Sequence, residues 1–208
     1  SDLEAWRSMN EAMANLMKRR LQDDSGEWRL FQLAFILASL PSLVTRLPEF
    51  QHHYNAERDD SVTLLYFSTG GGKSEAFFGL LAFNLFLDRL RNKIFGVTAL
   101  VRYPLRLLTV NQAQRMAKMM AEAEQVRQAK KYGGAPFSIG FWVGSGGSPN
   151  RHNSKGVSDI PLVNNVSISE EKLFESNMHY AAARKAWRKL PSCPFCGEET
   201  GIRRLPAN

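Results

Sequence analysis

The sequence LLYFSTGGGKSEAFFGLL, residues 64–81, decides which fold we predict for this chain. It opens with β-forming residues, continues through three glycines, a lysine and a serine, and then takes on a helical pattern. In such a loop the backbone N–H groups can surround a phosphate, the following helix N-terminus favours negative charge, and the lysine can reach the phosphate oxygens. The stretch therefore predicts a phosphate-binding loop between a strand and a helix.

This glycine loop is the expected site for ATP and Mg²⁺. The residues that we assign to it are Thr69, Gly70, Gly71, Gly72, Lys73 and Ser74. Lys73 is the predicted catalytic residue, which holds the β- and γ-phosphates, and Ser74 is the predicted Mg²⁺ ligand. The strict P-loop pattern begins with a glycine where this chain has Phe67. A plain glycine turn with an exposed lysine is the alternative, and the flanking strand and helix patterns favour nucleotide binding.

Strand and helix patterns alternate through the middle of the chain. Strands are expected at residues 62–67, 96–103 and 136–144, and helices at about 74–91 and 109–128. This alternation implies right-handed crossovers and an α/β fold, namely a parallel-sheet P-loop NTPase lobe that is incomplete. In the last helix the apolar side is assigned to Val110, Ala113, Met116, Ala117, Met120 and Ala123, and the polar side to Arg115, Lys118, Glu122 and Gln125.

Two helices are expected before the glycine loop. Apolar residues at helical spacing predict an amphipathic helix at residues 3–21. A nearly continuous apolar stretch predicts a short buried helix at residues 28–40, which stops at Pro41. Residues 47–60 are predicted to form a polar loop, and its two adjacent histidines are interpreted as solvated rather than metal-bound.

Composition and charge narrow the classes of partner. The chain has 27 lysines and arginines against 20 acidic residues, a net charge of +7, which favours a polyanionic partner such as nucleic acid. No secretory signal is visible, and the apolar run at residues 30–40 is too short to cross a bilayer, so no membrane partner is expected. Two cysteines exclude a disulfide scaffold and indicate a reducing, cytoplasmic location. The missing initiator Met and the abrupt end indicate a fragment.

The two cysteines have the spacing of a zinc knuckle. Cys193 and Cys196 stand two residues apart, a separation that fits one edge of a tetrahedral site, and Gly197 allows the chain to turn back. A redox C-x-x-C motif would open a helix, and the residues after Cys196 lack that pattern. A structural Zn²⁺ ion needs four ligands, so a second pair is expected downstream or from another chain.

The motifs together resemble a known helicase family. FSTGGGKSEAFFGLLAF resembles motif I of superfamily 2 helicases, and RYPLRLLTVNQAQR (residues 102–115) resembles motif Ia. With WRLFQLAFILASLPSL and FSIGFWVG, the order is similar to the large helicase of bacterial DISARM antiphage systems over about residues 28–150. Ser68 and Ser74 replace the usual proline and threonine. The resemblance implies a RecA-like lobe of an ATP-dependent DNA helicase or translocase in antiphage defence, with other defence-system subunits as partners.

The resemblance also implies contacts outside the glycine loop. The motif Ia positions assigned to single-stranded DNA are Arg102, Arg106, Thr109 and Gln112. Thr109 and Gln112 also read as a helix capping box, which is compatible with DNA contact because a capped helix aims its N–H groups. Gln32 resembles the upstream glutamine that reads the adenine edge, and an ordinary, partly buried helix glutamine is the alternative.

An acidic pair at a strand end, which hydrolysis by such a fold requires, is not found in the sequence. The chain alone is therefore predicted to be inactive. We divide it into an N-terminal helical extension (1–27), the partial lobe (28–145), and a linker, charged helix and start of a zinc-binding insertion (146–208).

Two other functions fit parts of the sequence. The first is a nucleotide-sensing, zinc-containing scaffold that binds nucleic acid or a partner without turnover. The second is a different P-loop enzyme, such as a kinase, which the missing first glycine and the motif Ia pattern disfavour.

Overall fold

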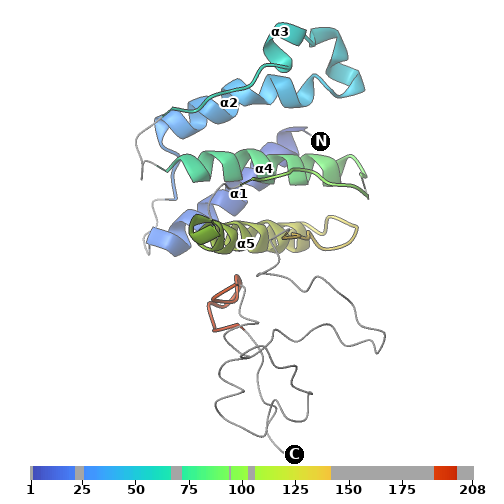
Figure 1. The fold of residues 1–208 in the computed structure, drawn as a ribbon. Helices are drawn as coiled ribbons and strands as arrows, with labels where there is room; N and C mark the ends of the chain where they lie inside the picture. Colours follow the sequence, from blue (N-terminus) through green and yellow to red (C-terminus); the bar gives the residue numbers. More distant parts are fainter. Residues whose placement is uncertain are drawn as a thin grey trace, which may run out of the picture. The chain divides into compact units, whose positions relative to one another are not determined.

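The computed structural model describes residues 2–21, 26–66, 72–93, 95–102, 106–141 and 190–200, with backbone alone at 20, 21 and 106–110. The helical elements are α1 (Asp2–Leu21), α2 (Leu30–Val44), the 3-10 helix η1 (Pro48–His53), α3 (Ala56–Asp59), α4 (Lys73–Leu90) and α5 (Arg106–Ala129) (Figure 1). The chain divides into two compact units. The first comprises Ser1–Arg102 and Met116–Ser138, and the second comprises Tyr103–Arg115 and Ile139–Asn208.

The predicted α/β fold with a parallel sheet is wrong for this structure. The described parts of the three expected strands, residues 62–66, 96–102 and 136–141, have no strand structure. Val62, Leu64 and Tyr66 are almost fully exposed. The prediction took apolar runs as evidence of strands covered on both faces, but a strand also needs a paired neighbour, which no local pattern specifies. Among the described residues the only β-pairing is an isolated antiparallel bridge between Ser192 and Glu199.

The helices, in contrast, lie close to where the periodicity predicts them. The helix expected at residues 3–21 is α1, the one expected at about 74–91 is α4, and the one expected at about 109–128 is α5. The apolar side predicted for α5 is buried at every position whose side chain is described. Helix periodicity needs only local sequence, because residues three and four apart share a face.

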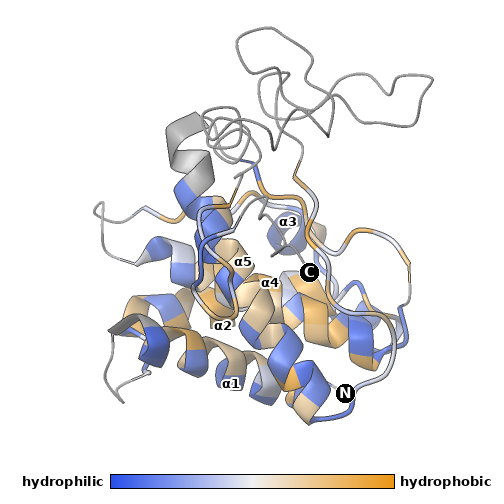
Figure 2. Cartoon of the chain, turned by 90° about the horizontal axis from the view of Figure 1, so that it is seen from below, coloured by the Kyte–Doolittle hydropathy of each residue, from blue (hydrophilic) through white to orange (hydrophobic). Residues whose placement is uncertain are grey.

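The core of the first unit is built from α1, α4 and the later part of α5. Helices α1 and α4 pack against each other, and α2 packs on α4 (Figure 1). Figure 2 shows α4 as mostly apolar and α1 with a polar side. The largest fully buried apolar side chains are Met9, Met13, Ile36, Phe86 and Met119.

Glu122 corrects one detail of the α5 prediction. It was expected on the polar side, yet it is buried, and its carboxylate lies 3.0 Å from the Arg19 guanidinium of α1. Burial raises the pKa of Glu122, and Arg19 opposes that shift. The periodicity placed Glu122 on the polar side because the local sequence does not show its partner. The ion pair with Arg19 of α1 allows this carboxylate to be buried.

Helix α2 runs past the position where it was expected to stop. It extends to Val44 and contains Pro41. The Pro41 carbonyl still accepts hydrogen bonds, from the Thr45 N–H at 2.9 Å and from the Thr45 hydroxyl at 2.6 Å. Proline lacks an N–H but keeps its carbonyl as an acceptor, so the bonds from Thr45 that close this last turn still form.

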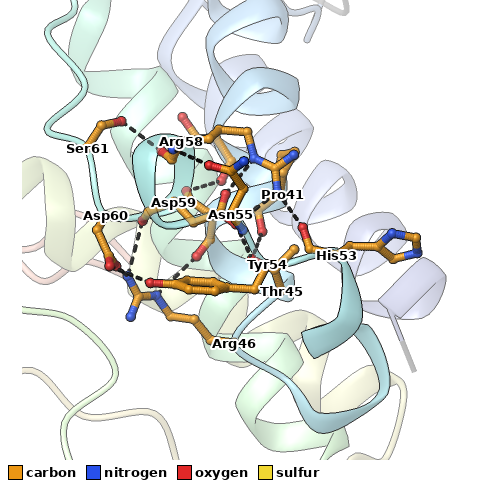
Figure 3. Close-up of polar contacts among 12 residues, drawn as sticks. Pro41, Thr45, Arg46, His53, Tyr54, Asn55, Arg58, Asp59, Asp60 and Ser61 are labelled. Atoms are coloured by element: carbon orange, nitrogen blue, oxygen red, sulfur yellow. Dashed lines mark hydrogen bonds and ion pairs between the residues drawn. The ribbon is translucent and has the colours of Figure 1, made fainter.

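The segment expected to be a polar loop contains the two short helices η1 and α3. A network centred on the buried Asp59 carboxylate holds them (Figure 3). Asp59 accepts hydrogen bonds from Arg58 Nε at 2.7 Å and from the Asn55 N–H at 2.9 Å, and its Oδ2 lies 3.0 Å from the Thr45 hydroxyl. The Arg58 bond is the main reason that the pKa of Asp59 lies well below its usual value. The network ties α3 to the end of α2.

A glycine contact fixes the spacing of α2 and α4. A Cβ added to Gly79 would lie 2.7 Å from Trp28 and 2.8 Å from Ile36, so only glycine allows this approach. The Trp28 indole N–H donates to Asn10 Oδ1 of α1 at 2.7 Å. Phe35 and Phe77 add an edge-to-face contact between α2 and α4, with ring centroids 5.2 Å apart. Trp28 thereby contacts both α1 and α4.

Candidate nucleotide and nucleic-acid site

The last glycine of the loop leads directly into a long helix. Gly72 has φ of +90°, a left-handed conformation that favours glycine, and stands at the N-cap of α4. Lys73 and Ser74 form the first turn of α4 and are half-buried. The N-terminus of an 18-residue helix carries partial positive charge and N–H groups that can bind an anion. Thr69, Gly70 and Gly71 lie outside the described residues.

Gln32 joins the start of α2 to this loop. Its Nε2 donates to the Gly72 carbonyl at 2.7 Å, and its Oε1 accepts from the Arg29 N–H at 2.9 Å. The side chain is only 3% exposed. Two residues that are 40 positions apart in sequence are therefore connected, and both were predicted to belong to the nucleotide site.

Glu75 is a residue of this region that the sequence analysis missed. It lies in the first turn of α4 and is 6% exposed. Its Oε2 lies 3.5 Å from the position that a Cβ on Gly72 would take. The signal available in the sequence was a carboxylate directly after the lysine and serine. Its burial, which is rare for an acidic side chain, is visible only in the structure.

The predicted DNA-contact residues lie around the start of α5. Arg102 is exposed in the segment before the helix, and α5 begins at Arg106, so Thr109 lies inside the first turn rather than at the N-cap. The side chains of Arg106 and Thr109 are outside the described residues. Gln112 is half-buried, and its Oε1 accepts a hydrogen bond from Arg115 Nη1 at 3.2 Å.

The two cysteines lie in a tight hairpin, residues 190–200, which we call the cysteine hairpin. The Cys193 N–H donates to the Glu198 carbonyl at 2.7 Å, and the Gly197 N–H donates to the Cys193 carbonyl at 3.0 Å. Gly197 has φ of +81°, as the predicted turn requires. Both cysteines are free thiols.

Hydrogen bonds within the cysteine hairpin reach the Cys193 sulfur. Hydrogen bonds from the backbone N–H groups of Cys196 and Phe195, together with the Cys196 side chain, lower the pKa of the Cys193 thiol. A metal ligand must be deprotonated, so these bonds favour the required form. Within the described part of the chain, no cluster of three or more histidine, cysteine or acidic side chains could hold a metal. The hairpin thus offers two ligands.

The helices of the described residues include none that is both long and apolar enough to cross a membrane. The two adjacent histidines, His52 and His53, are exposed at the end of η1, with ring centroids 3.9 Å apart.

Comparison with known proteins confirms the resemblance drawn from the motifs. The chain is 33% identical over 189 residues to the DISARM protein DrmA of Bacillus paralicheniformis, an alignment that covers 87% of this chain. The same alignment covers 15% of the length of that relative. No family model matches the chain, and no solved structure matches it.

Proposed function

Because the chain is similar to the DISARM protein DrmA over most of its length, we propose that it is part of an ATP-dependent DNA helicase or translocase of antiphage defence. The observation that carries the ATP-binding step is the start of α4. There Gly72 adopts the left-handed conformation, Lys73 and Ser74 form the first helical turn, and Gln32 holds the loop from α2.

Each residue at the start of α4 has a separate task in this proposal. Lys73 neutralises the β- and γ-phosphates, and Ser74 supplies the hydroxyl that would hold Mg²⁺, which itself neutralises phosphate charge. The N–H groups of the first turn of α4 add donors for phosphate oxygens.

Gln32 is assigned two roles in this proposal. Each end of its amide makes one hydrogen bond to backbone, yet the amide has a second N–H and further lone pairs. We assign these remaining groups to the adenine edge. The bond to Gly72 would then make recognition of the base depend on the position of the loop.

The nucleic-acid contact is assigned to the start of α5. Arg102, Arg106, Thr109 and Gln112 would hold the phosphate backbone of single-stranded DNA, and the net charge of +7 supports a polyanionic partner. Cys193 and Cys196 are assigned as two of the four ligands of a structural Zn²⁺ ion, which would hold the cysteine hairpin in its fold.

The test is ATP hydrolysis by the longest natural form of the protein, with and without single-stranded DNA. We expect DNA to stimulate turnover and Lys73→Ala to lower it by about 100-fold, because a positioned cation that stabilises transferred phosphate is lost. Lys118→Ala, which removes an exposed lysine of α5, is the matched control. ATP binding that depends on Lys73 without any DNA-stimulated turnover would instead establish the nucleotide-sensing scaffold.

A further inference from the structure

Glu75 places a buried carboxylate in the first turn of α4, directly after the two residues that are assigned to phosphate and Mg²⁺. Gly72 is the N-cap of this helix, so Glu75 is the third helical residue. The side chains of a helix lean towards its N-terminus, which brings this carboxylate back towards the glycine loop. The structure agrees, because Glu75 Oε2 lies 3.5 Å from the point that a Cβ on Gly72 would occupy.

The Gln32 amide lies on the same side of Gly72. Its Nε2 is 2.7 Å from that same point, and it donates to the Gly72 carbonyl at 2.7 Å. The start of α2 therefore lies against the first turn of α4, where Gln32 is 3% exposed and Glu75 is 6% exposed. Water and salt screen a charge weakly at such depth. The Glu75 carboxylate thus acts on the whole first turn of α4, the part of the chain that is assigned to phosphate.

The side-chain charges at the start of α4 nearly cancel. Residues 72–80 contain one basic residue, Lys73, and one acidic residue, Glu75. A helix N-terminus stabilises a carboxylate as it does a phosphate, so the partial positive charge of α4 already faces an anion of the chain itself. Lys73 and the N–H groups of the first turn can bind phosphate oxygens, but they leave most of the charge of a triphosphate to be neutralised by a cation.

We propose that Glu75 is a specificity-determining residue, which makes the site select the Mg²⁺ complex of ATP over metal-free ATP. Metal-free ATP carries about four negative charges and its Mg²⁺ complex about two, and repulsion by a fixed carboxylate grows with that charge. Ser74, the assigned Mg²⁺ ligand, directly precedes Glu75, so both residues belong to one helical turn. The inference rests on the ATP-binding assignment of the proposed function.

The size of the effect follows from Coulomb's law. Two additional phosphate charges within about 10 Å of a buried carboxylate, at an effective dielectric constant of about 40, change the affinity about tenfold. This factor concerns the preference for one form of ATP over the other. A change that only disturbs the packing of α4 weakens the binding of both forms and leaves their ratio as it was.

Glu75→Gln is the sharpest variant, because it keeps the size of the side chain and removes its charge. Glu75→Asp is the conservative variant, which keeps the charge and shortens the side chain. Glu122→Gln is the matched control, since it makes the same chemical change at another buried glutamate, on α5. The inference requires Glu75→Gln to gain affinity for metal-free ATP, a result that damage to the fold does not produce.

The experiment titrates the longest natural form of the protein with a fluorescent ATP analogue. One titration uses buffer depleted of divalent cations by a chelating resin, and the other uses saturating Mg²⁺ at the same ionic strength. Glu75→Gln is expected to bind the metal-free analogue more tightly than wild type does, and its preference for the Mg²⁺ complex is expected to be about tenfold smaller. Glu75→Asp and Glu122→Gln keep the charge at the start of α4 and should keep the wild-type preference within about threefold.

Three results would overturn the inference while ATP binding itself stands: an unchanged preference in Glu75→Gln, an equal weakening of both forms in Glu75→Gln, or a loss of the preference in Glu75→Asp as large as in Glu75→Gln. Wild type that binds both forms equally would contradict it as well. Wild type that binds neither form would count against the proposed function itself.

Discussion

At the scale of single residues, Gly72 and Gln32 matter most for the nucleotide site. A side chain at Gly72 would have to adopt φ of +90°, and its Cβ would lie 2.7 Å from Gln32 Nε2. The strained backbone and the collision with Nε2 would both weaken the hydrogen bond from Gln32 to the Gly72 carbonyl, which holds the loop to α2.

We therefore expect Gly72→Ala to lower ATP affinity by about tenfold or more, since a left-handed alanine costs about 1–2 kcal/mol. Fluorescence titration with an ATP analogue measures this. Gly140→Ala is the control, because a Cβ there meets nothing within 4 Å. Equal affinities of the two variants would show that the loop tolerates a side chain.

Two buried glutamates of α5 respond to acid in opposite directions. The Arg127 guanidinium, then Gln128 and the Phe137 N–H, lower the pKa of Glu124 from 4.5 to about 2. A lowered carboxyl pKa stabilises the folded state fully above pH 4.5, and this stabilisation is lost as pH falls from 4.5 towards 2. Burial raises the pKa of Glu122, so protonation of Glu122 favours the folded state.

Glu124→Gln is accordingly expected to weaken the residue 124–137 region at pH 7 and to reduce its sensitivity to acid between pH 4.5 and 2. Amide exchange of the segment around Phe137, whose N–H donates to Glu124 at 3.1 Å, is the measurement. Glu122→Gln serves as the comparison and should leave the acid-induced loss in place. The reverse pattern would show that the assigned ion pairs are incorrect.

Prediction from sequence at this scale was limited by contacts between distant residues. The glycine loop, Gln32 and the cysteine pair are local patterns, so the sequence alone could propose them as sites. The Gln32–Gly72 bond and the hydrogen bonds between the Gln114 side chain and the Ser192 backbone join residues 40 and 78 positions apart, and no periodicity encodes such partners.

At the scale of elements, the helices were predictable and the sheet was not. The amphipathic pattern places α1, α4 and α5 within a few residues of their observed bounds because a helix satisfies its hydrogen bonds locally. A strand depends on partners elsewhere in the chain, and the apolar residues at 62–66 have none among the described residues. Helix α2 extends past Pro41 to Val44. A proline in the last turn therefore need not end a helix when its carbonyl still accepts the closing hydrogen bond, here from the Thr45 N–H.

The packing of α2 on α4 depends on the absence of a side chain at Gly79. Gly79→Ala should destabilise the first unit by about 1–3 kcal/mol, because the new methyl overlaps Trp28 and Ile36. Chemical denaturation followed by tryptophan fluorescence, or amide exchange in α4, measures the loss.

A double-mutant cycle makes this test specific. Trp28→Leu removes the ring that the methyl would strike, so Gly79→Ala should cost less in that background. Additive effects of the two substitutions would show that the destabilisation comes from elsewhere.

At the scale of the whole molecule, two properties matter: the net charge of the chain and the share of its relative with which it aligns. The chain carries a net charge of +7, and its alignment with DrmA spans 15% of the length of that relative. The DISARM resemblance was predictable from motif order, whereas the structure around the motifs depends on packing that the motifs do not specify.

Electrostatic binding of single-stranded DNA should weaken as salt rises, because each phosphate contact releases counterions. Arg102→Ala is expected to reduce the slope of log Kd against log salt by about 1. Lys118→Ala, another exposed cation, should leave the slope unchanged. Identical slopes for all three proteins would remove Arg102 from the DNA contact.

The measurement that tests the central claim most directly is the affinity of the longest natural form for Mg²⁺-ATP, determined by calorimetry for wild type, Lys73→Ala and Lys118→Ala. We predict that wild type and Lys118→Ala bind equally and that Lys73→Ala binds about 10- to 100-fold more weakly, as the loss of a charge-assisted bond to phosphate requires. Equal binding by all three proteins, or no binding by wild type, would contradict a nucleotide site at the start of α4.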